Sequence, residues 1–223
     1  MSDSYRTLVK IHFKNATHII DTFHFLRYVE DALNAVRIRI QSSFGEPTKE
    51  YRILKKYWRI LSTYYLDVED KELYNNLKKR KTSTQEIIND SLNLSPNLEE
   101  AYNLTQIFLA GVREVKYEDA ENWISSWIRA LQESRNKEFN KLADTFINWK
   151  KEIINSFIRF GEKKLHNGYI EGMNNKIKVI KRTAYGYTNF THFRNRIMYM
   201  VNSNYVFKMV DRTKIHRKKR KRL

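Results

Sequence analysis

The chain has 223 residues, and 42 lysines and arginines against 25 aspartates and glutamates give it a formal net charge of +17. The hydrophobic content of 41% is enough for a folded core, and the charge favours an acidic polymer as partner, with nucleic acid ahead of an anionic membrane surface. The absence of cysteine excludes disulfides and thiolate metal sites, and no apolar run reaches the ~20 residues of a membrane span.

The N-terminal part of the chain predicts a helix, a short strand and a second helix. Residues 2–13 have helical apolar spacing, with Ser2 or Asp3 as the cap. Their expected buried side consists of Tyr5, Leu8, Val9 and Phe13. Residues 16–20 are the best strand candidate, and a long helix is expected from about 23 to 43.

Two polar residues, Asp21 and His24, stand where the long helix begins. Asp21 is placed to cap that helix, and the simplest interpretation of His24 is a partly buried histidine with a satisfied hydrogen bond.

The middle of the chain, roughly 45–160, predicts a helical region interrupted by loops. Loop signals occur at Gly45-Glu46-Pro47, 67–70, 80–83 and Ser95-Pro96-Asn97. The expected helices span about 48–64, 70–79, 84–92, 97–114, 117–134 and 136–160. The region contains Trp58, Trp123, Trp127 and Trp149, which are interpreted as core residues.

The most informative stretch is 167–197. After the turn signal Asn167-Gly168, an apolar stripe with spacings of 3 and 4 is formed by Ile170, Met173, Ile177, Ile180 and Ala184. A second stripe beside it is polar and consists of Glu171, Asn175, Lys178 and Arg182. Gly186 is expected to end this helix, and Asn189 or Thr191 to cap a second one with Phe193, Ile197 and Met200 as its apolar positions. On periodicity alone the stretch is an amphipathic helix with a solvated basic face.

The last segment, 208–223, holds nine lysines and arginines and one aspartate, and is predicted to be a basic disordered tail. Such a tail attracts phosphates without distinguishing base sequence.

From Glu171 onward the residues E-G-x-N-N-K-I-K-x-I-K-R-x-A-Y-G-Y-x-N-F-x-x-F-R-x-R-I resemble the C-terminal signature of bacterial DDE transposases of the ISL-three group. A second, shorter stretch, N-A-x-x-I-x-D-x-F-H at 15–24, is similar to a D-x-x-H motif of the same family.

The resemblance implies a mostly α chain that forms the C-terminal part of a ribonuclease-H-like domain with a large all-helical insertion. The implied parts are the end of the ribonuclease-H-like core at 1–44, the insertion at 45–160, the Glu-bearing helix and the following helix at 161–207, and the basic tail at 208–223.

By the same resemblance Glu171 is the third carboxylate of the Asp-Asp-Glu triad and a metal ligand, and Asp21 and His24 support the active site without binding metal. The residues expected to contact DNA are Asn174, Asn175, Lys178, Lys181, Arg182, Tyr185, Arg194 and Arg196. The family cofactor is Mg²⁺ or Mn²⁺, and the partner is double-stranded DNA at insertion-sequence ends, with no membrane and no small-molecule substrate. The implied location is the cytoplasm, near the nucleoid, and the oligomeric state is left open.

One departure from the family pattern concerns activity. Strand cleavage and transfer use two divalent ions held by several carboxylates, and the second Asp of the family stands before a Met in a D-M-x-x-x-Y pattern. Met1 and Tyr5 fit the end of that pattern, so the chain is expected to be truncated, to hold no metal stably and to be inactive alone unless Asp3 substitutes for a lost ligand.

Two other classes compete with this interpretation. The first is a non-catalytic basic helical DNA-binding protein, in which Glu171 only complements the helix dipole. The second, a structural protein bound to RNA, has no positive marker because no RNA-binding motif is recognised.

Overall fold

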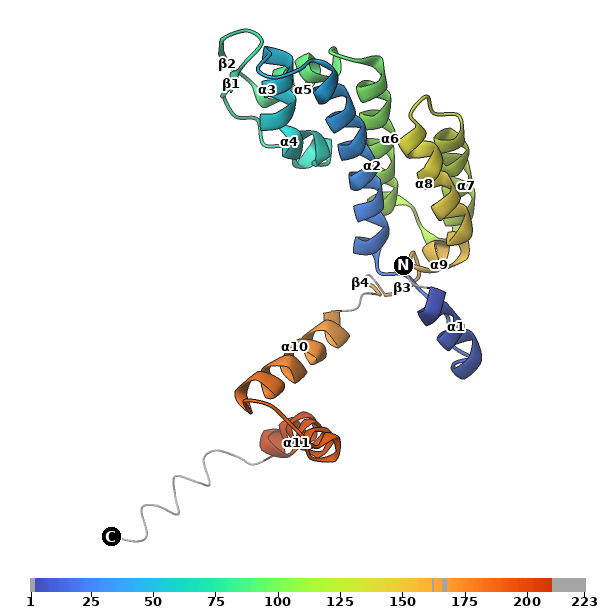
Figure 1. Ribbon diagram of the computed structural model, residues 1–223. Coiled ribbons are helices and arrows are strands. Elements are labelled where there is room, and N and C mark those ends of the chain that lie inside the picture. Colours follow the sequence, from blue (N-terminus) through green and yellow to red (C-terminus); the bar gives the residue numbers. More distant parts are fainter. Residues whose placement is uncertain (1–2, 162, 166–167, 210–223) are drawn as a thin grey trace, which may run out of the picture. The chain divides into compact units, whose positions relative to one another are not determined.

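The computed structural model describes residues 3–161, 163–165 and 168–209, and it is mostly helical (Figure 1). The chain divides into two compact units, which are described separately: unit 1 comprises 1–166 and unit 2 comprises 167–223. The predicted tail at 208–223 lies outside the described residues from 210 onward. Within the described part of the chain, no helix has the length and apolarity that crossing a membrane requires.

The helices of unit 1 are α1 (Asp3–His12), α2 (Thr22–Ser43), α3 (Lys49–Lys56), α4 (Trp58–Ser62), the short 3₁₀ helix η1 (Tyr65–Asp67), α5 (Thr84–Leu92), α6 (Pro96–Glu114), α7 (Tyr117–Gln132), α8 (Lys137–Asn148) and α9 (Lys150–Asn155). Two antiparallel hairpins complete it: β1 (Leu73–Asn75) pairs with β2 (Arg80–Thr82), and β3 (Arg159–Phe160) pairs with β4 (Lys163–Lys164). The mostly helical fold that the sequence predicts is therefore confirmed.

Helix α2 forms the centre of unit 1 because its apolar residues recur every three or four positions and make one long stripe. That stripe is fully covered and consists of Phe25, Val29, Ala32, Leu33, Val36 and Ile40. It packs against α6 and α8, and α7 packs in turn against α8 (Figure 1). Asp21 begins the helix as predicted, since its carboxylate accepts a hydrogen bond from the Phe23 backbone N–H at 3.0 Å.

The core of unit 1 is built around Phe108 of α6. Its ring lies 4.2 Å from that of Trp127 and 5.5 Å from that of Phe146, measured between centroids, and Phe25 of α2 meets it edge-on at 6.0 Å. Edge-on and offset contacts of this kind add to the burial of the rings themselves. Trp127 and Trp149 are buried and Trp123 packs against the core, so the core interpretation of the tryptophans is confirmed for these three.

Trp58 is the exception, because 38% of it is exposed and the guanidinium of Arg59 lies 5.1 Å from its ring centroid. The prediction that it belongs to the core is wrong. The neighbouring Tyr57 occupies the buried position instead, and its hydroxyl donates to the Tyr74 backbone carbonyl at 2.6 Å.

Two of the predicted helices are each divided at a buried aromatic residue. The helix expected over 48–64 breaks at Tyr57, and the one expected over 136–160 breaks at Trp149. Both residues have φ near −109° with ψ of 20° and 13°, outside the helical region. In each case the apolar spacing continues across the break, and apolar spacing alone does not reveal that the backbone turns.

The prediction of a helix over 70–79 is wrong, because this segment forms the β1–β2 hairpin. Asn75 is buried, and its side-chain oxygen accepts hydrogen bonds from the Leu77 and Lys78 backbone N–H groups at 2.9 and 3.3 Å. Its amide nitrogen donates to Asp90 at 2.6 Å. The Asn75 side chain thus takes up backbone N–H groups that a helix would have bonded, and the chain forms a turn instead. Lys79, with φ 54°, adopts the left-handed conformation at the end of this turn.

Two expectations for the N-terminal segment are also wrong. Residues 16–20 form no strand; the segment is held to α9 by hydrogen bonds from Ile20 N to Glu152 O at 3.4 Å and from Asn155 Nδ2 to His18 O at 2.9 Å. The expected buried side of α1 is open, because Tyr5, Leu8 and Phe13 are all exposed and no described residue of the helix is buried. Local spacing determines the helix, but burial depends on a packing partner.

Candidate nucleic-acid interface

Unit 2 is built from α10 (Gly168–Thr183) and α11 (Phe190–Met209). Helix α10 forms as the spacing predicts, and Ile180 of its apolar stripe is buried while Met173 and Ile177 are half-buried. Lys176 also ties the two helices together, since its ammonium donates to the Met200 backbone carbonyl at 2.9 Å. The side of α10 opposite this apolar stripe is exposed and is here called its outer face.

That face carries the polar residues that the sequence singles out. Glu171 lies in the first turn of α10, and Asn175, Lys178 and Arg182 follow it at helical spacing. All four are exposed, and Asn174 and Lys181 are exposed beside them. At 100° per residue these six positions fall within about a third of the helix circumference, so their side chains share one surface.

Positive charges greatly outnumber negative charges in unit 2. Residues 168–209 contain seven lysines and arginines, and Glu171 is their one carboxylate. Within the described residues, none of these cations forms an ion pair with Glu171. A lone carboxylate amid unpaired cations is suited to bind a cation of its own while its neighbours bind phosphate oxygens.

The connection between the two helices exposes a tyrosine. Tyr185 and Gly186 both have positive φ, 53° and 116°, which reverses the chain direction after α10. Tyr185 is fully exposed, whereas the ring of Tyr187 packs against that of Phe193 at 4.8 Å. Asn189 then caps α11 as predicted, since its side chain accepts from the Thr191 and His192 N–H groups at 2.8 and 3.3 Å.

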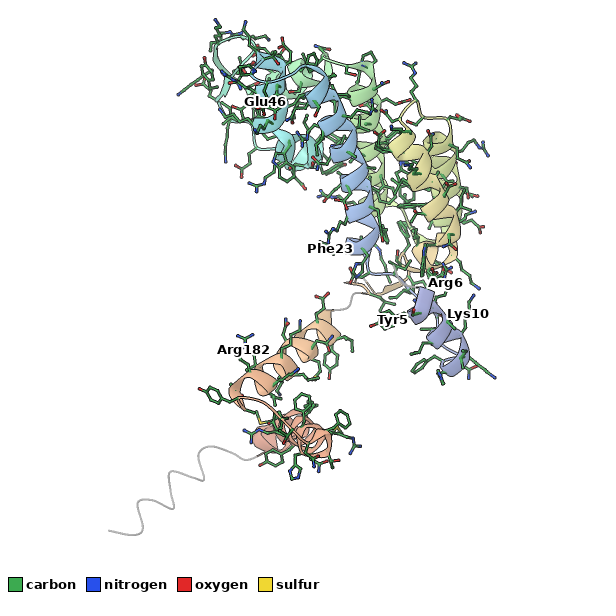
Figure 2. The ribbon with its side chains drawn as sticks, in the orientation of Figure 1. Tyr5, Arg6, Lys10, Phe23, Glu46 and Arg182 are labelled. Atoms are coloured by element: carbon green, nitrogen blue, oxygen red, sulfur yellow. The ribbon has the colours of Figure 1, made fainter. Side chains whose placement is uncertain are left out.

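Helix α11 carries the last two candidate DNA contacts. Arg194 and Arg196 are exposed, while the predicted apolar positions Phe193, Ile197 and Met200 are half-buried. Figure 2 shows the side chains of α10, with Arg182 labelled near the end of that helix. Every residue proposed for DNA contact is thus accessible.

Asp21 and His24 lie together at the start of α2, in unit 1. The His24 backbone N–H donates to the Asp21 carbonyl at 3.0 Å, and the exposed imidazole contacts the Phe23 ring edge-on at 6.0 Å between centroids. The expectation of a partly buried His24 is wrong, since the side chain is exposed. The first turn of α2 thus presents one carboxylate and one imidazole, at a helix start that Asp21 itself caps.

The donor set for a metal is incomplete within the described residues, which hold no cluster of three His, Asp or Glu side chains. Glu171 supplies one hard oxygen donor of the kind that Mg²⁺ and Mn²⁺ prefer, but a pair of ions needs several such groups. The residues present therefore do not by themselves fit a two-metal centre.

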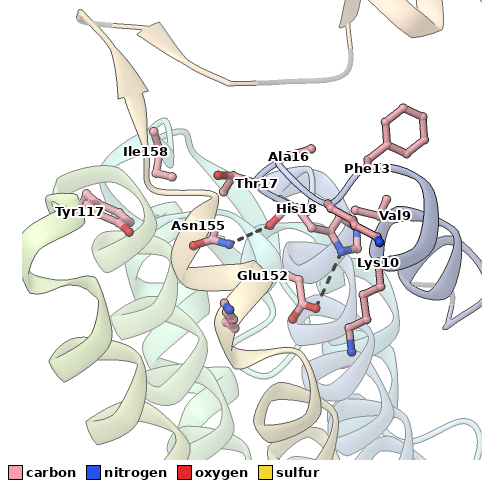
Figure 3. A pocket seen from close by; sticks show the side chains of 12 residues that line it. Val9, Lys10, Phe13, Ala16, Thr17, His18, Tyr117, Glu152, Asn155 and Ile158 are labelled. Atoms are coloured by element: carbon pink, nitrogen blue, oxygen red, sulfur yellow. Dashed lines mark hydrogen bonds and ion pairs between the residues drawn. The ribbon is translucent and has the colours of Figure 1, made fainter.

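A cavity of about 510 Å³ lies between α1, the 13–18 segment and α9. No motif in the sequence predicts it. Figure 3 shows its lining, including Lys10, His18 and Glu152. The Nδ1 atom of His18 lies 3.8 Å from the Glu152 carboxylate, which is 2.9 Å from the Arg6 Nε atom.

Arg6 also stacks on Trp149, with its guanidinium carbon 3.5 Å from the ring centroid, and donates to the Asn148 carbonyl at 2.7 Å. Since Arg6 and Glu152 are far apart in the chain and neither belongs to a motif, only the folded structure reveals this junction.

Comparison with known protein families identifies the family of the chain. The family model described as a transposase, of the ISL3 group of DDE enzymes, matches residues 1–197. The chain therefore belongs to the ISL3-group DDE transposases, the ISL-three group that its C-terminal signature resembles. Transposition is the general function of this family, DNA is its substrate and divalent metal ions are its general cofactors.

The chain is also similar to a curated protein of Lactococcus lactis subsp. lactis named "ATP-dependent protease", with 34% identity over 113 residues. The match covers 51% of this chain and 34% of that protein, so the chain spans about a third of the relative's length. The name describes that protein, most of which lies outside the match. No solved structure matches this chain.

Proposed function

We propose that this chain is the part of a DDE transposase that contacts insertion-sequence ends and supplies the third catalytic carboxylate, Glu171. The observation that carries the proposal is the outer face of α10, where one carboxylate stands among exposed amides and cations. The match of the family model to residues 1–197 supports it, because this stretch includes the whole of that face.

In this proposal the cations of unit 2 bind phosphates and the amides orient the DNA. Lys178, Lys181 and Arg182 lie along α10, and Arg194 and Arg196 lie on α11. Asn174 and Asn175 follow Glu171 by three and four residues, which is about one helical turn. Their amides are therefore close enough to hydrogen-bond Glu171 itself or a DNA group. The exposed Tyr185 is available for a sugar or base contact at the end of this row.

Glu171 would be one ligand of the divalent ions that activate a water or 3′-hydroxyl and stabilise the leaving oxygen in strand cleavage and transfer. Further carboxylates are required from other residues, so cleavage by this chain alone is not part of the proposal. Asp21 and His24 are proposed as positioning residues at the start of α2, where the capping bond of Asp21 fixes its carboxylate.

Residues 1–44 are proposed to belong to a ribonuclease-H-like core, with 45–160 as its helical insertion, 161–207 as the Glu-bearing part and 208–223 as a basic tail. The exposed apolar side of α1 supports the first assignment, because Tyr5, Leu8 and Phe13 would be covered by a sheet. A DNA partner also favours a location near the nucleoid.

The second candidate is a non-catalytic basic DNA-binding protein. One observation favours it: Glu171 lies in the first turn of α10, where a carboxylate is stabilised by the helix dipole whether or not it binds metal. Both candidates predict DNA binding, so they differ only in what Glu171 does.

The experiment that tests both compares three full-length variants with the unmodified protein. Lys178→Gln with Arg182→Gln should weaken binding to duplex DNA and reduce the slope of log K against log salt by about 2. The matched control, Lys137→Gln with Lys141→Gln on α8, removes the same charge from exposed positions of unit 1 and should change the slope little. Equal losses in the two double variants would contradict the assignment to α10.

Glu171→Gln separates the catalytic from the non-catalytic candidate. It should leave folding and duplex binding intact, because Gln keeps the shape and removes only a negative charge. In a transposase that supplies the other two carboxylates, it should abolish Mg²⁺-dependent cleavage. Undiminished cleavage by that variant would instead favour the non-catalytic protein.

A further inference from the structure

Unit 1 carries a second basic surface, made of residues that have no role in the function proposed for α10. Residues 49–62 hold five lysines and arginines and one glutamate, and residues 71–82 have the same composition. The structure brings these stretches together: the Tyr57 hydroxyl donates to the Tyr74 carbonyl at 2.6 Å, and β1–β2 lies beside α3 and α4 (Figure 1).

Some cations of this region are already neutralised. Lys78 contacts Glu86 and also lies 3.0 Å from Asp90, and Arg80 lies 3.1 Å from Glu86. The hydrogen bonds that the Lys78 ammonium donates to Glu86 and to Asp90 raise the pKa of Lys78. These two side chains serve the packing of the hairpin on α5 and are not counted as binding groups.

Lys55 and Lys71 are also paired, with Glu46 and Glu69, and three other cations have no carboxylate partner within the described residues. Lys56 and Arg59 lie on α3 and α4, and Lys81 lies on β2. All three are exposed and close to aromatic rings. The Lys56 ammonium is 5.9 Å from the Tyr74 ring centroid, and Lys81 is the cross-strand partner of Tyr74 in the hairpin register.

The aromatic residues of the same surface are unusually open. Tyr74 is 48% exposed although it stands in a strand, and Trp58 is exposed beside Arg59. Alternation explains this for the hairpin, since Asn75 and Thr82 point to the buried face and Tyr74 and Lys81 to the opposite one. Two exposed rings and three cations that have no carboxylate partner among the described residues therefore lie on these neighbouring elements; Lys56, Trp58, Arg59, Tyr74 and Lys81 are here called the hairpin surface.

We propose that the hairpin surface binds single-stranded nucleic acid. Its cations match the phosphates of one strand, and its rings match unpaired bases, whose faces are free to stack. A duplex would satisfy the cations alone, because its base faces are covered by their neighbours. The site does not involve Glu171 or α10, so it is independent of the function proposed above.

The test measures binding of the full-length protein to a labelled single-stranded DNA of mixed sequence and to the corresponding duplex. Tyr74→Leu removes the ring but keeps a residue suited to a strand, and the backbone carbonyl bonded to Tyr57 remains. It should weaken single-strand binding about fivefold or more and change duplex binding little. Lys56→Gln with Lys81→Gln should reduce the single-strand slope of log K against log salt by about 1.4.

Matched controls use equally exposed residues elsewhere in unit 1. Tyr117→Leu removes a 44% exposed ring that lies outside the hairpin surface and is followed by Glu118 and Asp119. Lys137→Gln with Lys141→Gln removes two exposed charges from α8. Circular dichroism verifies that every variant is folded, and neither control should weaken single-strand binding as the hairpin variants do.

Photo-crosslinking of a bromouracil-containing single strand gives an independent readout, with crosslinked peptides expected within 49–82. Unchanged single-strand affinity in the Tyr74 and Lys56/Lys81 variants would overturn the proposal. Equal weakening on single strand and duplex would also overturn it, since the surface would then bind phosphates only. Loss of duplex binding in the Lys178/Arg182 variant alone would bear on α10 and leave the hairpin surface unaffected.

Discussion

Unit 1 and unit 2 use their charged and apolar residues in opposite ways. In unit 1 a continuous core runs from α2 to α9, and arginines such as Arg39 are paired, here with Glu138 at 2.9 Å. Among the side chains described in 168–201 of unit 2, Ile180 alone is buried, and the cations of α10 have no carboxylate partner. Side chains that do nothing for the fold are the ones available for a ligand, so the exposed cations of unit 2 suit the DNA contacts proposed for them, whereas most of unit 1 serves stability.

The largest expected effect lies in the core of unit 1. Phe108→Ala should lower the free energy of unfolding by about 3–5 kcal/mol, because the ring is fully buried among Phe25, Trp127 and Phe146. Urea denaturation measures the loss. Tyr185→Ala removes a fully exposed ring of unit 2 and should leave the urea midpoint of unfolding unchanged. A loss of stability as large as that of Phe108→Ala would contradict the difference in packing between the units.

A smaller effect is expected from the same substitution at one glycine in each unit. A Cβ at Gly111 of α6 would lie 2.0 Å from the Trp123 ring, whereas at Gly172 of α10 nothing lies within 4 Å. Gly111→Ala should therefore cost about 1–3 kcal/mol despite the better helix propensity of alanine. Gly172→Ala should raise the helical stability of α10 by up to about 1 kcal/mol.

Thermal unfolding followed by circular dichroism compares the two glycine variants. The expected signs are opposite, and a stabilising Gly111→Ala would show that the ring of Trp123 moves aside without cost.

The smallest effect concerns the junction that holds α1 to the rest of unit 1. Arg6→Lys should loosen α1 by about 1–2 kcal/mol, because lysine lacks the planar fork that contacts Trp149, Asn148 and Glu152 together. Amide hydrogen exchange within 3–12 should accelerate, while exchange in α2 should not. Lys10→Gln, on the same helix and in the lining of the cavity, serves as the control (Figures 2 and 3).

Local patterns in the sequence were sufficient for most elements of both units. The cap at Asp21, the stripe of α2, the end of α10 near Gly186 and the cap at Asn189 depend on a few neighbouring residues, and all are found in the structure. The candidate face of α10 could also be predicted, because helical spacing alone places Glu171, Asn175 and Lys178 together.

The errors arose where long-range contacts decide the structure. The 70–79 segment becomes a hairpin because Asn75 is buried against Asp90, and the helices divide at Tyr57 and Trp149 because those rings enter the core. The junction of Arg6 with Glu152 joins residues 146 positions apart in the chain. No local pattern encodes such contacts, so neither the cavity beside them nor the hairpin surface could be predicted from spacing.

The sparse packing between α10 and α11 has a mechanical consequence. Within the described residues, the Lys176–Met200 hydrogen bond joins the two helices, the Tyr187 ring of the connection packs on Phe193, and Ile180 is the one buried residue of α10. Because so few contacts hold them, the angle between α10 and α11 should change at a small energetic cost compared with the cost of shearing a packed core. In the DNA complex proposed above, such a connection would let the row of cations on α10 follow the local curvature of a duplex while the turn at Tyr185 and Gly186 keeps the two helices connected.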